Sequence, residues 1–281
     1  MTEPSKMATE NTITVRRMNF EINADMDKYW FNGNPLISAF FYALSATFPD
    51  GERFFIDTVR YYQKDVEDPV LKQQIRAFIG QEAHHGKAHE DFNEALEAKG
   101  FPMAVIAAKA KGLLDLAKER LSPQRQLAIT VALEHVTATL AEHALRHPDL
   151  LEQMDPTFRD MIVWHAVEEI EHKSVAFDVF RERVGNEYLR RRVMFMTLIM
   201  FFGRVMYFQK LILRADNRKA TWREWWQAMK FFWGKDGLVR ESLIHFAKAF
   251  KKGFHPSDID QQPLVNDWQQ RYPEIAALQT N

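Results

Sequence analysis

The chain of 281 residues has no cysteine. Disulfides, thiolate metal sites and cysteine nucleophiles are therefore excluded, and any bound metal must be held by nitrogen and oxygen ligands. A chain without cysteine also fits a reducing compartment. The polar opening, MTEPSKMATENT, lacks the apolar stretch of a secretory signal, so we expect a cytoplasmic protein.

A strong net charge is also absent, since 37 Lys and Arg stand against 38 Asp and Glu. No global charge attracts nucleic acid, and we expect no nucleic-acid partner. The sequence has no glycine-rich phosphate loop and no alternation of strands with helices. The uncharged run at residues 193–203 has 11 residues, which is too few to span a bilayer, since that needs about 20.

What the sequence does contain is long helical periodicity. Asp-Pro or Ser-Pro pairs, which commonly begin helices, stand at 68–69, 122–123 and 155–156. Several segments approach roughly 25–30 residues, well above the usual helix length of about 11–12, and this is typical of a bundle. The expected helices cover residues 36–48, 52–65, 69–99, 103–120, 123–147, 156–184 and 189–214, with a kink or break at 49–51. These features predict an all-α fold, a ferritin-like four-helix bundle with additional C-terminal helices.

We expect three parts along the chain. Residues 1–33 form an N-terminal tail and arm, in which the imperfect alternation at 12–22 favours an extended conformation. Residues 34–185 form the helical bundle that holds the metal site. Residues 186–281 form a C-terminal helical extension packed on the bundle, with an irregular tail from Gly253.

Residues 189–234 leave two alternatives open. Basic residues at 190–192, 210, 214, 218 and 219 flank the apolar segment 193–208, and tryptophans follow at 222, 225, 226 and 233. One alternative is a helix buried against the bundle. The other is a surface for peripheral membrane contact or partner binding, for which clustered tryptophan and flanking basic residues are typical.

Two Glu-x-x-His motifs, Glu82/His85 and Glu169/His172, carry the clearest chemical pattern. At about 100° per residue, a spacing of three brings both side chains of a pair onto one helix face, so both can bind one ion. Glu52 and Glu134 stand on two further predicted helices. A Glu from each of two helices, together with Glu-x-x-His from each of the other two, is the carboxylate-bridged two-metal arrangement of ferritin-like bundles.

Charge balance supports the same interpretation. Four carboxylates supply a charge of about −4, which matches two divalent ions, whereas their burial without metal would be costly or would leave them protonated. The alternative is that Glu52 and Glu134 are exposed on the surface. Glu134 argues against this, because residues 127–140 around it hold no other charged side chain apart from the titratable His135.

His165 lies four residues before Glu169 and seven before His172, so all three fall on one helix face. His165 is therefore a seventh candidate ligand. The helical angle alone does not choose between Glu168 and Glu169. We prefer Glu169 because it repeats the spacing of the other Glu-x-x-His motif.

Three neighbouring side chains are assigned other roles. His89 is on the inner face of its helix, seven residues after Glu82, and we expect it to support a ligand rather than bind metal itself. Glu142 and His143 are expected to be exposed.

The series Glu…Glu-x-x-His…Glu…His-x-x-x-Glu-x-x-His resembles that of the p-aminobenzoate N-oxygenase group of di-iron enzymes, which have one more His ligand than ordinary ferritin-like proteins. This resemblance implies seven ligands: Glu52, Glu82, His85, Glu134, His165, Glu169 and His172. The phrase FPDGERFF at 48–55, with EAHH at 82–85 and Trp164-His165, resembles more closely the bacterial family labelled "predicted metal-dependent hydrolase", over about residues 15–270. That label implies metal dependence.

Ligand chemistry favours iron, because carboxylates can shift between bridging and terminal binding as the oxidation state changes, and the lack of thiolates excludes iron–sulfur clusters. We predict a non-haem di-iron protein with two iron ions (Fe2+/Fe3+), or with manganese or a mixed Mn/Fe pair. Its predicted activity is that of an oxygenase or oxidase that uses O2 and an electron donor on a hydrophobic small molecule. The alternatives are a dinuclear metal-dependent hydrolase and a non-catalytic ferritin-like metal-binding protein. A homodimer and association with a membrane are further expectations.

Overall fold

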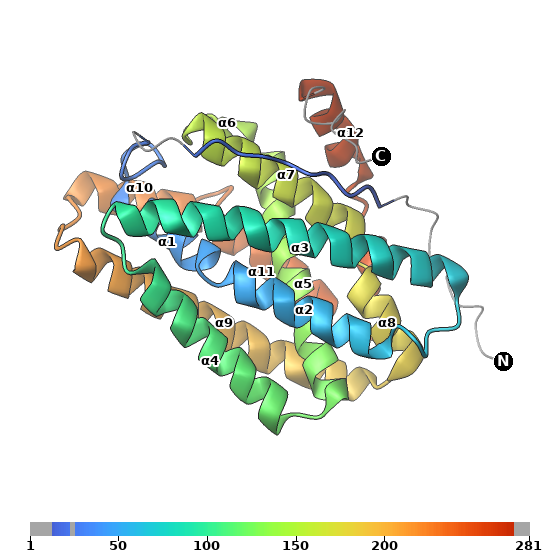
Figure 1. The fold of residues 1–281 in the computed structure, drawn as a ribbon. Helices are drawn as coiled ribbons and strands as arrows, with labels where there is room; N and C mark the ends of the chain where they lie inside the picture. The colour runs from blue at the N-terminus through green and yellow to red at the C-terminus, as the bar shows by residue number, and fades with distance from the viewer. Residues whose placement is uncertain (1–12, 23–25, 273–281) are drawn as a thin grey trace.

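The computed structural model describes residues 13–22 and 26–272, and within these ranges the regular structure is helical (Figure 1). The β contact recorded there is an isolated bridge between Phe31 and Met154. The prediction of an all-α fold is confirmed, while the ferritin-like relationship and the division into three parts stay predictions. The predicted tail at residues 1–12 lies outside the described residues.

Four helices form a ring in the middle of the molecule: α2 (Phe48–Tyr62), α3 (Pro69–Ala98), α5 (Pro123–Arg146) and α7 (Pro156–His172). α2 packs against α3 and α5, and α7 packs against the same two helices, which closes the ring. The carboxylates of Asp68 and Asp155 accept hydrogen bonds from first-turn backbone N–H groups and so cap α3 and α7. Gly100 follows α3 with a φ of +91°, a left-handed conformation that favours glycine at a helix end.

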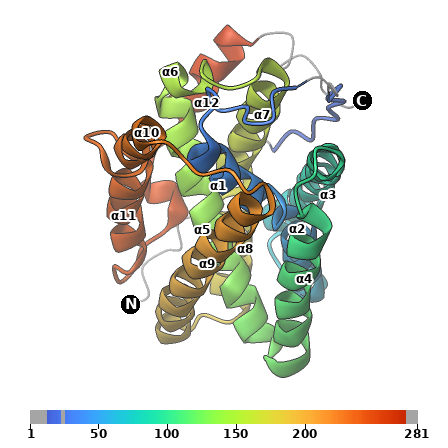
Figure 2. The same ribbon diagram turned by 90° about the vertical axis from the view of Figure 1, so that its left-hand side faces the viewer.

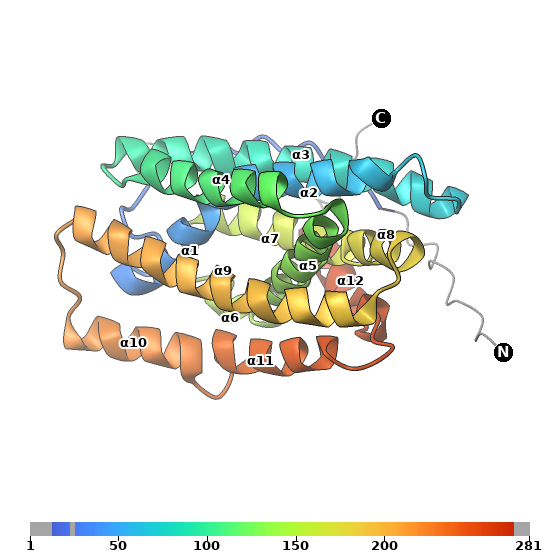
Figure 3. The ribbon, with the colours of Figure 1, turned by 90° about the horizontal axis from the view of Figure 1, so that it is seen from below.

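The remaining helices surround this ring. They are α1 (Pro35–Ser45), α4 (Met103–Arg120), α6 (Pro148–Leu151), α8 (Val175–Arg183), α9 (Glu187–Ala215), α10 (Trp222–Trp233), α11 (Leu238–Ala249), the 3-10 turn η1 (Pro256–Asp258) and α12 (Gln262–Arg271). α9 packs along α1 and α5. α10 and α11 follow one another beside α9 on the outer side of the molecule (Figure 2, Figure 3).

Two predicted helix boundaries and one predicted irregular segment are wrong. The first break lies at residues 46–47, and Pro49 falls in the first turn of α2, where a residue without an N–H is tolerated. The predicted helix 156–184 is interrupted after His172, where Lys173 donates to the backbone carbonyl of Ile259. The segment after Gly253 is not irregular throughout, because it includes α12.

α9 has one buried and one exposed side. Met194, Val205, Phe208 and Ile212 are buried, whereas Phe195, Met196, Ile199 and Met200 are each at least 50% exposed. Among the described residues, α9 is the one helix that is long and apolar enough to cross a membrane by length and composition, with 22% of its most apolar window buried. One side of the helix is thus buried against the bundle, while contact of the exposed side with a membrane or a partner stays a prediction.

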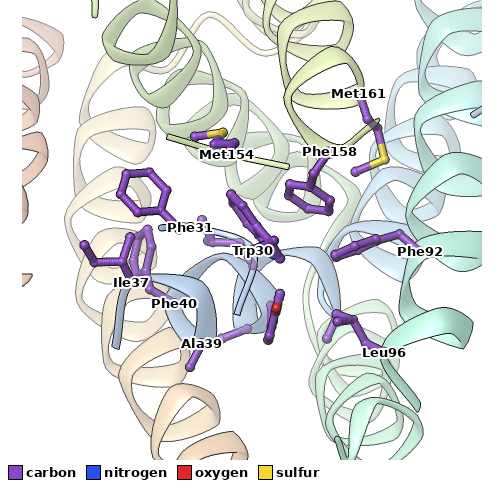
Figure 4. Packing of buried hydrophobic residues seen from close by; sticks show 14 of the residues in the cluster. Trp30, Phe31, Ile37, Ala39, Phe40, Phe92, Leu96, Met154, Phe158 and Met161 are labelled. Carbon is purple, nitrogen blue, oxygen red and sulfur yellow. The ribbon is translucent and has the colours of Figure 1, made fainter. Parts of the chain in front are cut away.

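Several aromatic rings contact one another in the larger of two apolar clusters (Figure 4). The ring centroid of Phe158 lies 4.0 Å from that of Trp30 and 3.9 Å from that of Phe92. These contacts join the segment before α1 to α3 and α7. The segment before α1 is thereby fixed to α3 and α7, the two helices that carry the Glu-x-x-His motifs.

Replacing Phe92, which is 1% exposed, by Ala should lower the free energy of unfolding by about 3–5 kcal/mol, because the neighbouring rings cannot fill the space left behind. Urea unfolding followed by circular dichroism measures this. Tyr61→Ala is the control, since Tyr61 is 62% exposed and its loss should change stability by about 0.5 kcal/mol or less. Equal midpoints for wild type and Phe92→Ala would contradict the importance of this cluster.

Candidate metal centre

The structure brings all seven candidate ligands together inside the helix ring. Each is at most 5% exposed: Glu52, Glu82, His85, Glu134, His165, Glu169 and His172. They project from α2, α3, α5 and α7. Apolar rings enclose them from both clusters, since Trp164 contacts His85 edge-on and Phe78 contacts His172 in the same way.

The polar atoms of this group lie close to one another. His172 Nε2 lies 3.1 Å from Glu82 Oε1 and 3.4 Å from Glu134 Oε2. Glu169 lies between two histidines, with Oε1 2.9 Å from His165 Nε2 and Oε2 3.5 Å from His172 Nε2. Two ligand atoms at right angles, each about 2.1 Å from one ion, are about 3 Å apart. The observed separations are of the size that shared ions require.

The ligand atoms also fall into adjoining sets. One oxygen or nitrogen each of Glu52, Glu82 and His85 lie within 4.8 Å of one another, and the same holds for Glu82, Glu169 and His172. Because the two sets share Glu82, these residues could hold two neighbouring ions.

Many of these atoms have no hydrogen-bond partner among the described residues. The buried atoms without a partner include both carboxylate oxygens of Glu52, Glu82 and Glu134. His85 Nδ1 and His172 Nε2 are two more. Buried polar atoms are almost always paired, and an unpaired one costs about 1–3 kcal/mol. Eight such atoms in one place fit a group that binds cations.

Burial and mutual repulsion perturb the pKa values of the carboxyl groups. Burial, and after it the charge of Glu82, holds the pKa values of Glu52 and Glu134 well above their usual range. Burial raises the pKa of Glu82 to about 7, against the opposing effect of His172. For Glu169, the effect of burial is outweighed by the charge of His172 and by the hydrogen bond and charge of His165, so the pKa of Glu169 is held well below its usual range. Without cations, these carboxyl groups compete for protons.

The structure distinguishes Glu168 from Glu169. The carboxylate of Glu169 lies inside the cluster, whereas Glu168 lies behind His85, with its Oε2 3.0 Å from His85 Nε2. Glu168 Oε1 accepts hydrogen bonds from the backbone N–H and the guanidinium of Arg16, at 3.1 and 3.2 Å. His85 is thereby held with Nδ1 toward the cluster. This arrangement favours Glu169 as the ligand and Glu168 as the group that orients His85.

A parallel chain of contacts supports His172. Its Nδ1 donates to Gln81 Oε1 at 2.9 Å, and Gln81 Nε2 donates to Glu171 Oε2 at 3.0 Å. Arg16 donates to both oxygens of Glu171, at 2.9 and 2.7 Å. Arg16 comes from the non-helical segment 13–22 and is 3% exposed. One cation therefore lies behind both Glu-x-x-His histidines, and the sequence interpretation missed it.

His89 is placed to orient His165. Its Nε2 lies 2.9 Å from His165 Nδ1, and its Nδ1 lies 2.9 Å from Ser45 Oγ. Both ring nitrogens are thus already engaged by protein groups. This arrangement favours the supporting role over direct metal binding.

Gly86 allows α2 to approach α3 at the site. A Cβ atom added there would lie 3.1 Å from Glu52 Oε2, and the next nearest atoms belong to the backbone of Pro49. The glycine in this position therefore makes space for the carboxylate of Glu52.

The prediction that Glu142 and His143 are exposed is wrong, since they are 2% and 5% exposed. His143 Nδ1 lies 2.8 Å from Glu241 Oε2 on α11, and Gln261 Nε2 donates to Glu142 Oε2 at 2.5 Å. The C-terminal helices cover this side of α5, which the pattern of α5 alone does not reveal.

A cavity of about 80 Å³ adjoins the cluster. His89, His165 and Glu169 line it, and most of the remaining wall consists of Phe, Leu, Ile, Met and Ala side chains. His143 also lines the cavity, and its buried Nε2 has no hydrogen-bond partner in the described part of the chain. The arrangement can hold an apolar molecule with one polar atom beside the candidate metal ligands.

Metal affinity should rise with pH between about 6 and 8. The raised pKa values of Glu52, Glu82 and Glu134 keep protons on the metal-free protein near neutral pH, and the pKa of His172 is also raised. Metal must displace these protons. The metal affinity should therefore rise about tenfold per pH unit for each proton that is released. Calorimetric titration with Mn2+ in two buffers of different ionisation enthalpy counts the protons. An affinity that stays constant from pH 6 to 8 would contradict the expectation.

Comparison with known proteins gives a match to the family model described as "Predicted metal-dependent hydrolase", over residues 14–260. No match is found among curated proteins or among solved structures. The matched region contains Arg16 and all seven candidate ligands, and the buried Glu and His groups agree with a metal-dependent family. The sequence resemblance to this family is thus confirmed, while the resemblance to p-aminobenzoate N-oxygenases stays a prediction. The chain belongs to the predicted metal-dependent hydrolase family.

Proposed function

We propose that the seven clustered residues hold two metal ions, preferentially iron, and that the protein oxidises an apolar small molecule with O2. The observation that carries the proposal is the set of eight buried, unpartnered ligand atoms beside an apolar cavity. Iron bound there would supply the redox equivalents and Lewis acidity for O2 chemistry. An electron donor is required to restore the reduced state.

The carboxylates divide into fixed and adaptable groups. Glu169 is held by His165 and by a short hydrogen bond from the Thr137 hydroxyl. Glu52 and Glu134 have no hydrogen bond on either oxygen within the described ranges. No protein hydrogen bond would therefore hold Glu52 or Glu134 in one orientation toward a bound metal, whereas Glu169 would keep its position.

The cavity wall determines what can reach the site. Its polar side chains are Ser45, His89, Thr137 and His143, together with the candidate ligands His165 and Glu169, and no Lys or Arg is among its described lining residues. Such a wall excludes water from the substrate side of the centre and binds uncharged, apolar groups. A substrate carrying phosphate would find no Lys or Arg there, and its counter-charge would have to come from the metal ions.

Hydrolysis is the second candidate, because the family description names it. Two ions could activate a hydroxide for attack on an ester or amide. Because Lys and Arg are absent from the described cavity wall, the mostly apolar wall favours uncharged substrates for this candidate as well. The two reactions differ in their need for O2.

Glu82→Gln, Glu134→Gln and His172→Ala should each lower the bound metal from two ions per chain to one or none, because each removes a ligand from a buried site. Metal content after dialysis is measured by mass spectrometry. Glu94→Gln is the matched control, since Glu94 is exposed on the same helix as Glu82. Retention of two ions by all three ligand variants would rule out the proposed ligand set.

The reaction type is tested with metal-free protein loaded with two Fe2+ per chain without oxygen and then exposed to O2. We expect O2 consumption well above that of free Fe2+ and a new absorption band, because carboxylate-bound iron pairs react faster than the aqueous ion. Zn2+-loaded protein is the redox-inert control. The proposed reaction would be hydrolysis instead of oxidation if the Zn2+ form hydrolysed a neutral apolar ester without oxygen and the iron form consumed no O2. Inactivity of both would leave a metal-binding protein.

A further inference from the structure

Charge is distributed very unevenly along this nearly neutral chain. Residues 187–253, from the start of α9 to just after α11, contain 15 Lys and Arg but only 5 Asp and Glu, whereas the whole chain has a net charge of −1. This segment therefore carries a formal charge of +10 and the rest of the chain −11. A positive segment of this size attracts anionic surfaces.

α10 presents an apolar face to solvent. Trp222, Trp225, Trp226, Met229 and Trp233 are 77%, 53%, 63%, 47% and 54% exposed. Their spacing of three, four and seven residues places them on one side of the helix. The opposite side is anchored through buried Ala228 and Phe231. Tryptophan exposed to this degree is unusual for a surface that only faces water.

The exposed side of α9 continues this face. One hollow, of about 710 Å³, is lined both by Met206 of α9 and by Trp225, Met229 and Trp233 of α10. Lys210, Arg214, Arg218 and Lys219 line the same hollow, and its described lining contains no acidic residue. Beyond it on α9, Phe195, Met196, Ile199 and Met200 are exposed. We call this surface, from Phe195 to Trp233, the α9–α10 face; Figure 3 shows the two helices that carry it.

We infer that the α9–α10 face docks on an anionic lipid bilayer, with α9 and α10 lying along the surface. Exposed Trp and Met can enter the boundary between headgroups and acyl chains, while Lys and Arg bind lipid phosphates. α9 does not cross the bilayer in this arrangement, because its buried side packs on α1 and α5.

A second copy of the chain is a weaker occupant of this face. A two-fold interface would place the same surface on both partners. It would then bring two segments of formal charge +10 against each other. A bilayer with anionic headgroups instead supplies the opposite charge, and it accommodates apolar side chains of any shape.

A groove bordered by Met200 of the α9–α10 face shares wall residues with the cavity beside the candidate centre; this step rests on the proposed function. It has a volume of about 180 Å³, and its wall is almost wholly apolar. Met200 and Arg204 of α9 line its outer part, and Phe48 and Thr137 line both this groove and the cavity beside the cluster. Docking would therefore place a lipid-soluble substrate at an apolar path toward the metal ligands.

Vesicle co-sedimentation of the full chain tests the docking. We expect binding to phosphatidylcholine vesicles that contain about 30% phosphatidylglycerol, at least about tenfold weaker binding to pure phosphatidylcholine, and weakening between 50 and 300 mM salt. Trp222→Ser/Trp226→Ser and Lys210→Gln/Lys219→Gln should each weaken binding by about tenfold or more. Tyr61→Ser and Lys64→Gln/Arg76→Gln remove an exposed aromatic ring or exposed charges elsewhere and should bind like wild type.

Circular dichroism and metal content show whether each variant is folded. If the Trp double variant does not fold, the Lys double variant still tests the proposal. Equal binding to both vesicle types, or no binding at 50 mM salt, would overturn the proposal. The proposal would also be overturned if the wild type formed a dimer and did not bind vesicles, while the Trp variant was a monomer in analytical ultracentrifugation. Metal-free protein should bind vesicles equally well, so a failure of the proposed enzymatic function leaves this result unchanged.

Discussion

The structure depends on the burial of several carboxylates in one small volume. Glu52, Glu82, Glu134 and Glu169 project from four different helices into a space closed by aromatic rings. Like charges so close repel strongly in a low-dielectric interior, and each helix that brings one inward adds to the cost. The ring of helices is therefore stable only with compensating positive charge, from protons, histidines or metal ions.

The sequence was sufficient to predict the helices and the group that they bring together, because both follow from local periodicity. Glu82/His85 and Glu169/His172 are pairs within single helical turns, and their geometry does not depend on the rest of the chain. Arg16 could not be predicted in the same way, since its partners lie more than 150 residues away. The burial of His143 likewise depends on α11, which packs on α5 from a distant part of the chain.

The helix ring and the C-terminal helices also differ in what they expose. The ring conceals its charges in the centre, whereas α9 and α10 expose aromatic and basic groups on one surface. Residues 187–253 and the rest of the chain carry opposite formal charges, which attract each other over a distance of about 10 Å at moderate salt. This attraction adds to the apolar packing of α9 on α1 and α5.

The position of Arg16 couples docking of the N-terminal segment to metal binding at the candidate centre. Its guanidinium contacts Glu168 and Glu171, which in turn fix His85 and, through Gln81, His172. If docking of residues 13–22 favours the ligand orientation that binds metal, then bound metal must favour docking by the same factor. Backbone hydrogen exchange near Thr14 and Arg16 would then report on occupancy of the centre without any probe placed inside it.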